Sequence, residues 1–163
     1  MLKVILFVIL DTLFTIFVCL FVNWWAPLFA NDKGWLPNWL SWVQTFDDTL
    51  DAGSRDGVFT TNSVFLARVF WLYRNPGYGF SYWALGVPFN ASEWTVETYN
   101  TDPLHFLAKG PNGQFNLHII KFGFRFKLGW KAWNMYNKTN GEWLTTPWGP
   151  EMRIPFTLSI SKA

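Results

Sequence analysis

The densest group of side chains that could do chemistry is acidic and lies in the stretch FDDTLDAGSRDG. Asp47, Asp48, Asp51 and Asp56 fall within ten residues, and clustered carboxylates are typical ligands of calcium. The EF-hand pattern places oxygen ligands at alternate positions and a glutamate at the twelfth. A loop begun at Asp51 has glycine and arginine at ligand positions and Asn62 at the twelfth. Because the pattern fails, we expect a solvated acidic turn and no bound metal.

The rest of the chain carries no recognisable catalytic motif. It lacks G-x-S-x-G, H-E-x-x-H and a glycine-rich phosphate loop. His105 in DPLHF and His118 in NLHII are expected to be structural, and no Cys/His cluster is available for zinc. We therefore predict a protein that is not an enzyme and uses no cofactor. The alternative is an interfacial enzyme acting on lipid or cell wall, with Asp47, Asp48, Asp51 and His105 as its acid–base set.

The basic residues are concentrated near the C-terminus. Residues 103 to 163 hold eight basic and two acidic side chains, whereas residues 26 to 102 hold four and eight. In IKFGFRFKLGWKA, apolar residues alternate with Arg125, Lys127 and Lys131, which predicts one strand with an apolar face and a basic face. Such a surface attracts lipid headgroups or nucleic acid. KFGFRFK is partly similar to the RNP1 signature, but its spacing differs, so a nucleic-acid-binding sheet is only an alternative.

The N-terminal segment is long and apolar. Residues 4 to 22 include a single charged side chain, and at ~1.5 Å per residue they reach about 28 Å, close to the thickness of the hydrocarbon core. Trp24 and Trp25 follow, as at a membrane interface. We expect residues 1–25 to form a transmembrane anchor. A cleaved signal peptide is the rival, but its apolar core would be shorter and no A-x-A site follows.

Asp11 lies near the middle of this segment. Thr15, Cys19 and Asn23 follow it at steps of four, so the four residues share one face of the helix. A carboxylate at that depth requires a partner or a proton. The stripe therefore predicts contact with another helix or a second copy, unless Asp11 is neutral and bonded locally.

Arg68 is a second charge in an apolar segment. A guanidinium there requires a carboxylate or a phosphate, and the candidates are Asp11, Asp47, Asp48 and Asp51. The alternative is an arginine on the solvent face of an ordinary helix.

The stretch around RNPG predicts a helix, a tight turn and a return. Ser63 can cap a helix that begins at the next residue and must end before Pro76, and Pro76-Gly77 suits a type II turn. We expect this hairpin at the membrane boundary, with Arg74 reaching headgroups, Asn75 extended and the hydroxyls of Tyr73 and Tyr78 in water. LPNWLSWVQTF predicts a further short helix on the same boundary.

Beyond residue 90 the periodicity predicts antiparallel strands. Strands are expected at residues 93 to 99, at 115 to 131 with a bulge or turn near Ile119, and at 152 to 160, beginning at Met152. Asn140-Gly141 indicates a hairpin that ends at Thr145. The fold class is α+β: a transmembrane helix (1–25), an interfacial helix-turn segment (26–89) and a meander of four to five strands (90–163). Residues 26–163 are expected to form one domain, with the apolar sheet face packed on residues 35 to 89.

Three segments, TFDDTLDAG, RVFWLYRNPGYGF and FGFRFKLGWKAW, resemble a family of uncharacterised small membrane-associated proteins of tailed bacteriophages. The resemblance covers residues 40 to 135, and RNPGYGF is its most specific part. It implies a phage product in the inner membrane of the host, without a settled activity and without catalytic residues.

These observations predict a single-pass, non-enzymatic membrane protein. It would bind the bilayer and either another membrane or envelope protein or a second copy of itself, for example in superinfection exclusion. A lysis accessory of holin type is the alternative in a different class.

Overall fold

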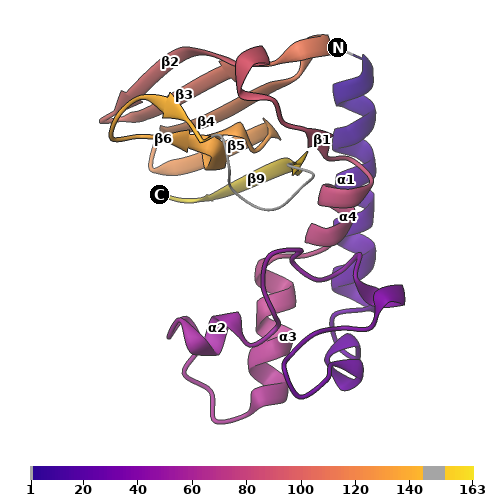
Figure 1. The fold of residues 1–163 in the computed structure, drawn as a ribbon. Coiled ribbons are helices and arrows are strands. Elements are labelled where there is room, and N and C mark those ends of the chain that lie inside the picture. The colour runs from indigo at the N-terminus through magenta and orange to yellow at the C-terminus, as the bar shows by residue number, and fades with distance from the viewer. Residues whose placement is uncertain (1, 145–152) are drawn as a thin grey trace. The chain divides into compact units, whose positions relative to one another are not determined.

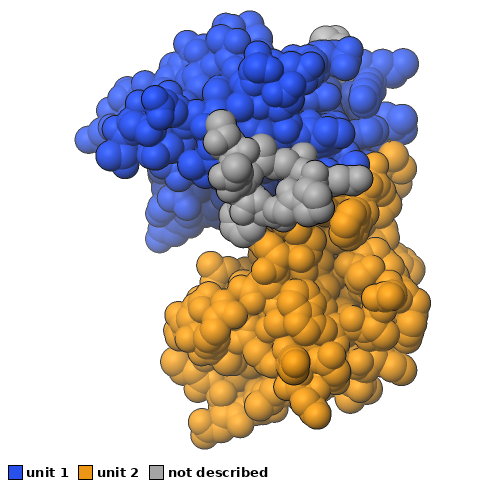
Figure 2. Space-filling view, in the orientation of Figure 1, with its two compact units in different colours: residues 1–8, 85–163 blue, residues 9–84 orange. Residues whose placement is uncertain are grey.

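The computed structural model describes residues 2–144 and 153–163 (Figure 1). The chain forms two compact units (Figure 2): unit 1 comprises Met1–Val8 and Leu85–Ala163, and unit 2 comprises Ile9–Ala84. The predicted α+β class is confirmed, with a long apolar N-terminal helix, several short helices and a five-stranded antiparallel sheet near the C-terminus. The predicted boundaries at residues 25 and 89 stay a prediction.

Helix α1, Leu2–Phe21, is long and apolar enough to span a membrane. Its composition alone would also suit a signal sequence or a core helix of a soluble protein. One face is exposed and carries large apolar side chains, among them Leu13, Phe17 and Leu20, whereas Asp11 and Val18 are buried. The exposed face of α1 is therefore apolar, whereas the face that packs against the rest of the chain includes the polar side chain of Asp11.

Unit 2 is completed by short helices. Helix α3, Val64–Arg74, begins and ends as predicted: the Leu66 backbone N–H donates to the Ser63 hydroxyl at 3.3 Å, and the helix stops before Pro76. Gly77 then adopts φ 64°, and a Cβ at this position would lie 2.8 Å from the Phe14 ring. The chain continues into α4, Tyr78–Trp83. The other helices of unit 2 are α2, Ala52–Arg55, and two 3₁₀ helices, Ala26–Phe29 and Asn38–Leu40.

The prediction of a helix in LPNWLSWVQTF is wrong beyond the first turn. Only Asn38–Leu40 is helical, as a 3₁₀ turn. The Trp42 carbonyl accepts from the Phe80 N–H at 2.8 Å, and the buried Gln44 side chain accepts from the Leu36 N–H at 2.7 Å. Tertiary hydrogen bonds thus replace the helical ones that the apolar spacing suggested.

The hydrophobic core of unit 2 joins both ends of its sequence. Val18 and Val22 from the N-terminal helix are buried with Leu40, Val43 and Leu72. Removing α1 would therefore remove part of this core, so α1 is more than a tether.

Unit 1 is built on a sheet with strand order β2-β3-β4-β5-β9 and antiparallel neighbours throughout. The strands are β2 Thr95–Thr101, β3 Leu104–Lys109, β4 Phe115–Lys121, β5 Phe124–Trp130 and β9 Phe156–Lys162. Two short pairs accompany it: β1 Val87–Pro88 with β8 Arg153–Ile154, and β6 Tyr136–Asn137 with β7 Glu142–Trp143. The Asn140-Gly141 hairpin signal lies between β6 and β7, as predicted; Thr145 and Met152 lie outside the described residues.

The single strand expected over residues 120 to 131 is wrong. β4 and β5 are separated by Phe122 and Gly123, which both have positive φ, 54° and 75°, and Lys121 pairs with Phe124. Positive φ at both central residues is what a type I′ hairpin requires. This turn, rather than a bulge at Ile119, changes the phase of the apolar pattern, and phenylalanine is an uncommon residue for it.

Within β5 the predicted alternation of an apolar and a basic face holds, but the basic face is partly covered. Leu117, Phe126 and Leu128 point to one face, where Phe7 of α1 contacts Trp130 and Phe156. The other face carries Phe106, His118 and Lys127, paired in that order across β3, β4 and β5. Its β2–β4 side is covered by an aromatic cluster made of Tyr99, Phe106, Trp133, Tyr136 and Trp143. Part of the face that carries the basic residues is therefore buried in the hydrophobic core of unit 1.

Candidate functional site

A small basic pocket lies where the aromatic cluster of unit 1 ends. Its volume is about 130 Å³. The described residues that line it are Asn116 and His118 from β4, Lys127 from β5, Thr157 from β9, and Lys131, Trp133 and Asn134 from the segment after β5. None of these lining residues is acidic.

The register of the strands brings together the residues at the base of this pocket. His118 pairs with Lys127, and Asn116 pairs with Gly129, which pairs with Thr157 on its other side. Directly opposed residues of antiparallel strands point to the same face. Polar side chains from three strands, β4, β5 and β9, therefore meet on one surface.

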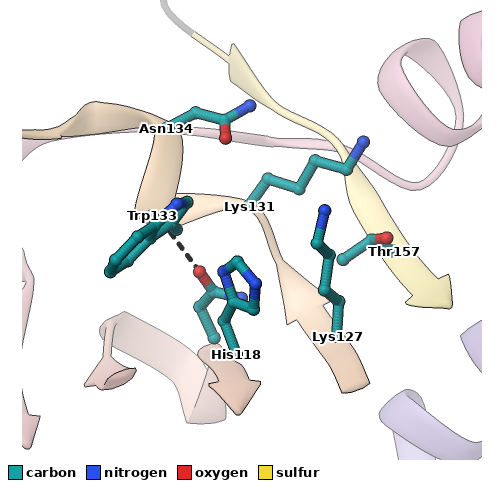
Figure 3. A pocket seen from close by; sticks show the side chains of 7 residues that line it. His118, Lys127, Lys131, Trp133, Asn134 and Thr157 are labelled. Atoms are coloured by element: carbon teal, nitrogen blue, oxygen red, sulfur yellow. Dashed lines mark hydrogen bonds between the residues drawn. The ribbon is translucent and has the colours of Figure 1, made fainter. Parts of the chain in front are cut away.

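A 3₁₀ turn, Ala132–Met135, forms one wall. The Trp133 backbone N–H donates to Asn116 Oδ1 at 2.8 Å (Figure 3). The Trp133 ring meets the His118 ring edge-on at 5.0 Å, and Lys138 Nζ lies 4.4 Å from the centre of the same Trp133 ring. Both contacts occupy the surroundings of the Trp133 ring and compete with the stacking of a base on it.

His118 is the most constrained polar group in the pocket. Its side chain is only 5% exposed, and its Nε2 is buried without a hydrogen-bond partner among the described residues. Burial, followed by the charges of Lys127, Arg125 and Lys138, lowers the pKa of His118 to about 4. The ring is therefore neutral at pH 7.

Two of the cations near His118, Arg125 and Lys127, repel each other. Burial and the neighbouring Arg125 lower the pKa of Lys127 below its ordinary value. Arg125 also has a buried Nε without a hydrogen-bond partner in the described part of the chain. Figure 3 shows His118 and Lys127 rising from neighbouring strands, with the Lys131 side chain reaching across above them. Three of the residues selected from sequence, Arg125, Lys127 and Lys131, thus belong to this neighbourhood.

The acidic turn of unit 2 is arranged differently. Arg68 donates to both Asp51 oxygens, from Nε at 2.6 Å and from Nη2 at 2.8 Å. The side chains of Arg68 and Asp51 are 13% and 36% exposed. Arg55 forms a second forked pair with Asp48, at 3.0 and 2.7 Å. The hydrogen bond from Arg55 holds the pKa of Asp48 below its ordinary value. Among the four candidate partners of Arg68, the structure selects Asp51.

The remaining candidates lie at other places in unit 2. Asp47 is exposed, and its charge adds to burial in raising the pKa of Tyr78, whose ring lies 5.9 Å from Phe46. The expectation of a water-exposed Tyr78 hydroxyl is therefore wrong.

Two further candidates lie at the end of α3. Arg74 is exposed in the last turn of this helix, and Asn75 donates from Nδ2 to the Trp71 carbonyl.

Asp11 accepts a hydrogen bond from the Ser81 hydroxyl of α4 at 2.5 Å. Further along the same helix face, the Tyr73 hydroxyl donates to the Cys19 carbonyl at 2.8 Å. The polar stripe of α1 thus lies against α3 and α4 of the same chain. Among the described residues, no group of three His, Cys, Asp or Glu side chains could hold a metal ion.

Sequence reasoning missed Asn116, Thr157 and the role of His118. A signal was present, because Asn116 and His118 alternate with the apolar Leu117 and Ile119 and must face the opposite side. Without the turn at Phe122 and Gly123, nothing placed that side next to Lys127.

The chain belongs to DUF7338, described as a family of unknown function, whose model matches residues 1–162. No curated protein matches the chain. No solved structure matches it either.

Proposed function

We propose that this protein is a single-pass, non-enzymatic protein of a tailed bacteriophage, located in the inner membrane of the host cell. It would act by binding another membrane or envelope protein or by modifying the host envelope, for example in superinfection exclusion. The phage origin rests on the RNPGYGF segment and the two segments that accompany it in the sequence.

The observation that carries the membrane location is the two-sided character of α1. In its most apolar 18-residue window, 11% of the residues are buried, which argues against the core helix of a soluble protein. Val18 and Val22 nevertheless belong to the core of unit 2. A segment that contributes to the folded core is poorly suited to removal as a signal peptide.

An aromatic group at the end of α1 supports the same location. Trp25, Phe29 and Trp39 are exposed and contact one another, with ring centroids 5.3 to 6.3 Å apart. Trp24 is also exposed. Indole rings favour the boundary between headgroups and hydrocarbon, where one side is apolar and the N–H stays wet.

The absence of enzymatic activity is supported by the ion pairs of the acidic turn. An interfacial hydrolase would use Asp48 or Asp51 as a general acid or base. Each carboxylate is held by a forked pair of hydrogen bonds, Asp48 by Arg55 and Asp51 by Arg68, and the hydrogen bond from Arg55 lowers the pKa of Asp48. Their geometry suits fixed structural charges.

Fractionation of the full-length protein tests the membrane location. We expect the wild type to stay in the pellet after an alkaline carbonate wash, with an uncleaved N-terminus by mass spectrometry. Leu13→Arg/Phe17→Arg places two charges on the exposed face of α1 and should release the protein. Val58→Arg/Thr60→Arg adds the same charge to an exposed loop and should leave it in the pellet. A wild-type protein found in the supernatant would contradict the proposal.

The role is tested by expressing the protein alone in host cells and challenging them with phage. We expect a reduced plating efficiency at an unchanged membrane potential. Collapse of the potential on induction would favour the holin-type alternative instead.

A further inference from the structure

The pocket of unit 1 combines two properties that rarely persist without a ligand. It is lined by cations without an acidic residue among the described lining, and it contains a buried polar atom, His118 Nε2, that lacks a hydrogen-bond partner there. Buried polar groups are otherwise nearly always hydrogen-bonded. We propose that this pocket binds a phosphoryl group, either as free phosphate or as the phosphate of a lipid headgroup.

The size of the pocket fits one such group. A cavity of roughly 150 Å³ holds a benzene-sized molecule, and the volume here is about 130 Å³. A phosphate, with five non-hydrogen atoms, falls within that range, whereas a nucleoside does not. Among the described lining residues, Trp133 is the only aromatic one besides His118, and it already contacts His118 and Lys138, which disfavours the stacking of a base.

The available donors favour phosphate over a carboxylate. An ammonium group comes from Lys127, a hydroxyl from Thr157, and a side-chain amide from Asn134, while Lys131 adds positive charge to the lining. His118 is neutral and carries a single ring proton, and because its Nε2 is covered in this structure, a hydrogen bond from Nε2 to a ligand would require a small rotation of the ring. These donors come from neighbouring strands and a turn. Inorganic phosphate offers four oxygens to them in a tetrahedral arrangement, and a headgroup phosphodiester offers two anionic and two ester oxygens in the same arrangement, whereas the two oxygens of a carboxylate lie in one plane.

The charge also selects the ligand. Repulsion between Arg125 and Lys127 raises the free energy of the pocket, and Lys127, Arg125 and Lys138 all disfavour a proton on His118. An anion removes that repulsion, whereas a metal cation would increase it. Bound phosphate should therefore raise the pKa of both His118 and Lys127 toward their ordinary values.

Titration calorimetry on the full-length protein in a neutral detergent tests this inference. The probes are inorganic phosphate and dihexanoylphosphatidylglycerol, with dihexanoylphosphatidylcholine as the lipid of zero net charge. We expect saturable binding of at least one anionic probe, and a loss of at least tenfold in affinity for Lys127→Gln. Lys121→Gln makes the same charge change on the opposite face of the same sheet, and should change the affinity less than twofold.

The pattern of binding identifies the source of the group. Binding of inorganic phosphate alone assigns the pocket to free phosphate, and binding of phosphatidylglycerol alone, dependent on Lys127, assigns it to a headgroup. Thr157→Val keeps the shape while removing one donor, and should weaken binding even if Lys127→Gln fails to fold. Equal losses in Lys127→Gln and Lys121→Gln, or no binding of either anionic probe, would overturn the proposal.

Discussion

The acidic turn of unit 2 and the basic pocket of unit 1 both concentrate charge, but among the described residues they differ in the contacts that neutralise it. Asp48 and Asp51 each accept a forked pair of hydrogen bonds from an arginine. In the pocket, burial and the charge of Arg125 disfavour the protonated form of Lys127. His118 Nε2 has no hydrogen-bond partner in the described part of the chain. Charges that are paired by hydrogen bonds stabilise the folded state. Like charges held close together lower its stability unless a ligand of opposite charge binds between them. The comparison therefore assigns a structural role to the acidic turn and a binding role to the pocket.

The largest expected effect is a loss of stability in mild acid that comes from the pocket. The pKa of His118 is about 4 in the folded protein, below its ordinary value of 6.5, so the unfolded chain binds the extra proton more readily. Stability is therefore complete above pH 6.5 and falls as the pH drops toward 4, by up to about 3 kcal/mol. Chemical denaturation at several pH values should show this slope in the wild type and a flatter one in His118→Gln. Equal slopes in both proteins would contradict the assigned burial.

The next effect comes from breaking the better buried pair of the acidic turn. Asp51→Asn leaves the Arg68 guanidinium mostly buried without its counter-charge, and we expect a loss of about 2 kcal/mol in the free energy of unfolding. Replacing both partners, as Asp51→Asn/Arg68→Met, should recover much of this loss, because no unpaired charge remains. Denaturant unfolding measures both. A double variant less stable than Asp51→Asn would mean that Arg68 serves another contact.

The opposite sign is expected in the pocket. Lys127→Met removes a cation that burial and Arg125 both disfavour, so it should raise the free energy of unfolding by up to about 1 kcal/mol. The same change should remove anion binding. Stabilisation together with loss of binding is typical of a functional site. A destabilised Lys127→Met would place this residue in a structural role and weaken the comparison.

The smallest effect is expected at the exposed pair of the acidic turn. Asp48→Asn should leave the thermal midpoint nearly unchanged at physiological salt, because the Arg55 side chain is exposed and the interaction is screened. The pKa of Asp48 is lowered in the folded protein, so any contribution is present above its unfolded pKa and is lost as the pH falls. Thermal unfolding at neutral pH and in acid checks both statements.

Local signals predicted much of this fold. Ser63 as a helix cap, the stop before Pro76 and the Asn140-Gly141 hairpin each depend on a few neighbouring residues, and each is found as expected. LPNWLSWVQTF failed beyond its first turn because contacts from Phe80 and Gln44, which are distant in sequence or made by a side chain, decided its backbone.

The pocket could be predicted only in part. Arg125, Lys127 and Lys131 were selected from their alternation with apolar residues. His118, Asn116 and Thr157 join them through strand register, and that register depends on a turn with phenylalanine at positive φ. Composition carries no signal for such a turn. The sequence therefore predicted the basic residues of the pocket but not the strand residues that lie beneath them.

Side-chain NMR of His118 tests the central comparison most directly. The full-length protein, labelled with ¹⁵N and held in a neutral detergent, would be titrated with inorganic phosphate and with dihexanoylphosphatidylglycerol at pH 7. We predict a saturable shift of the His118 Nε2 resonance with at least one of them, while the Nε resonances of Arg55 and Arg68 stay in place. An unmoved His118 signal, or equal shifts at His118 and at the two arginines, would contradict the assignment of the pocket as the binding site.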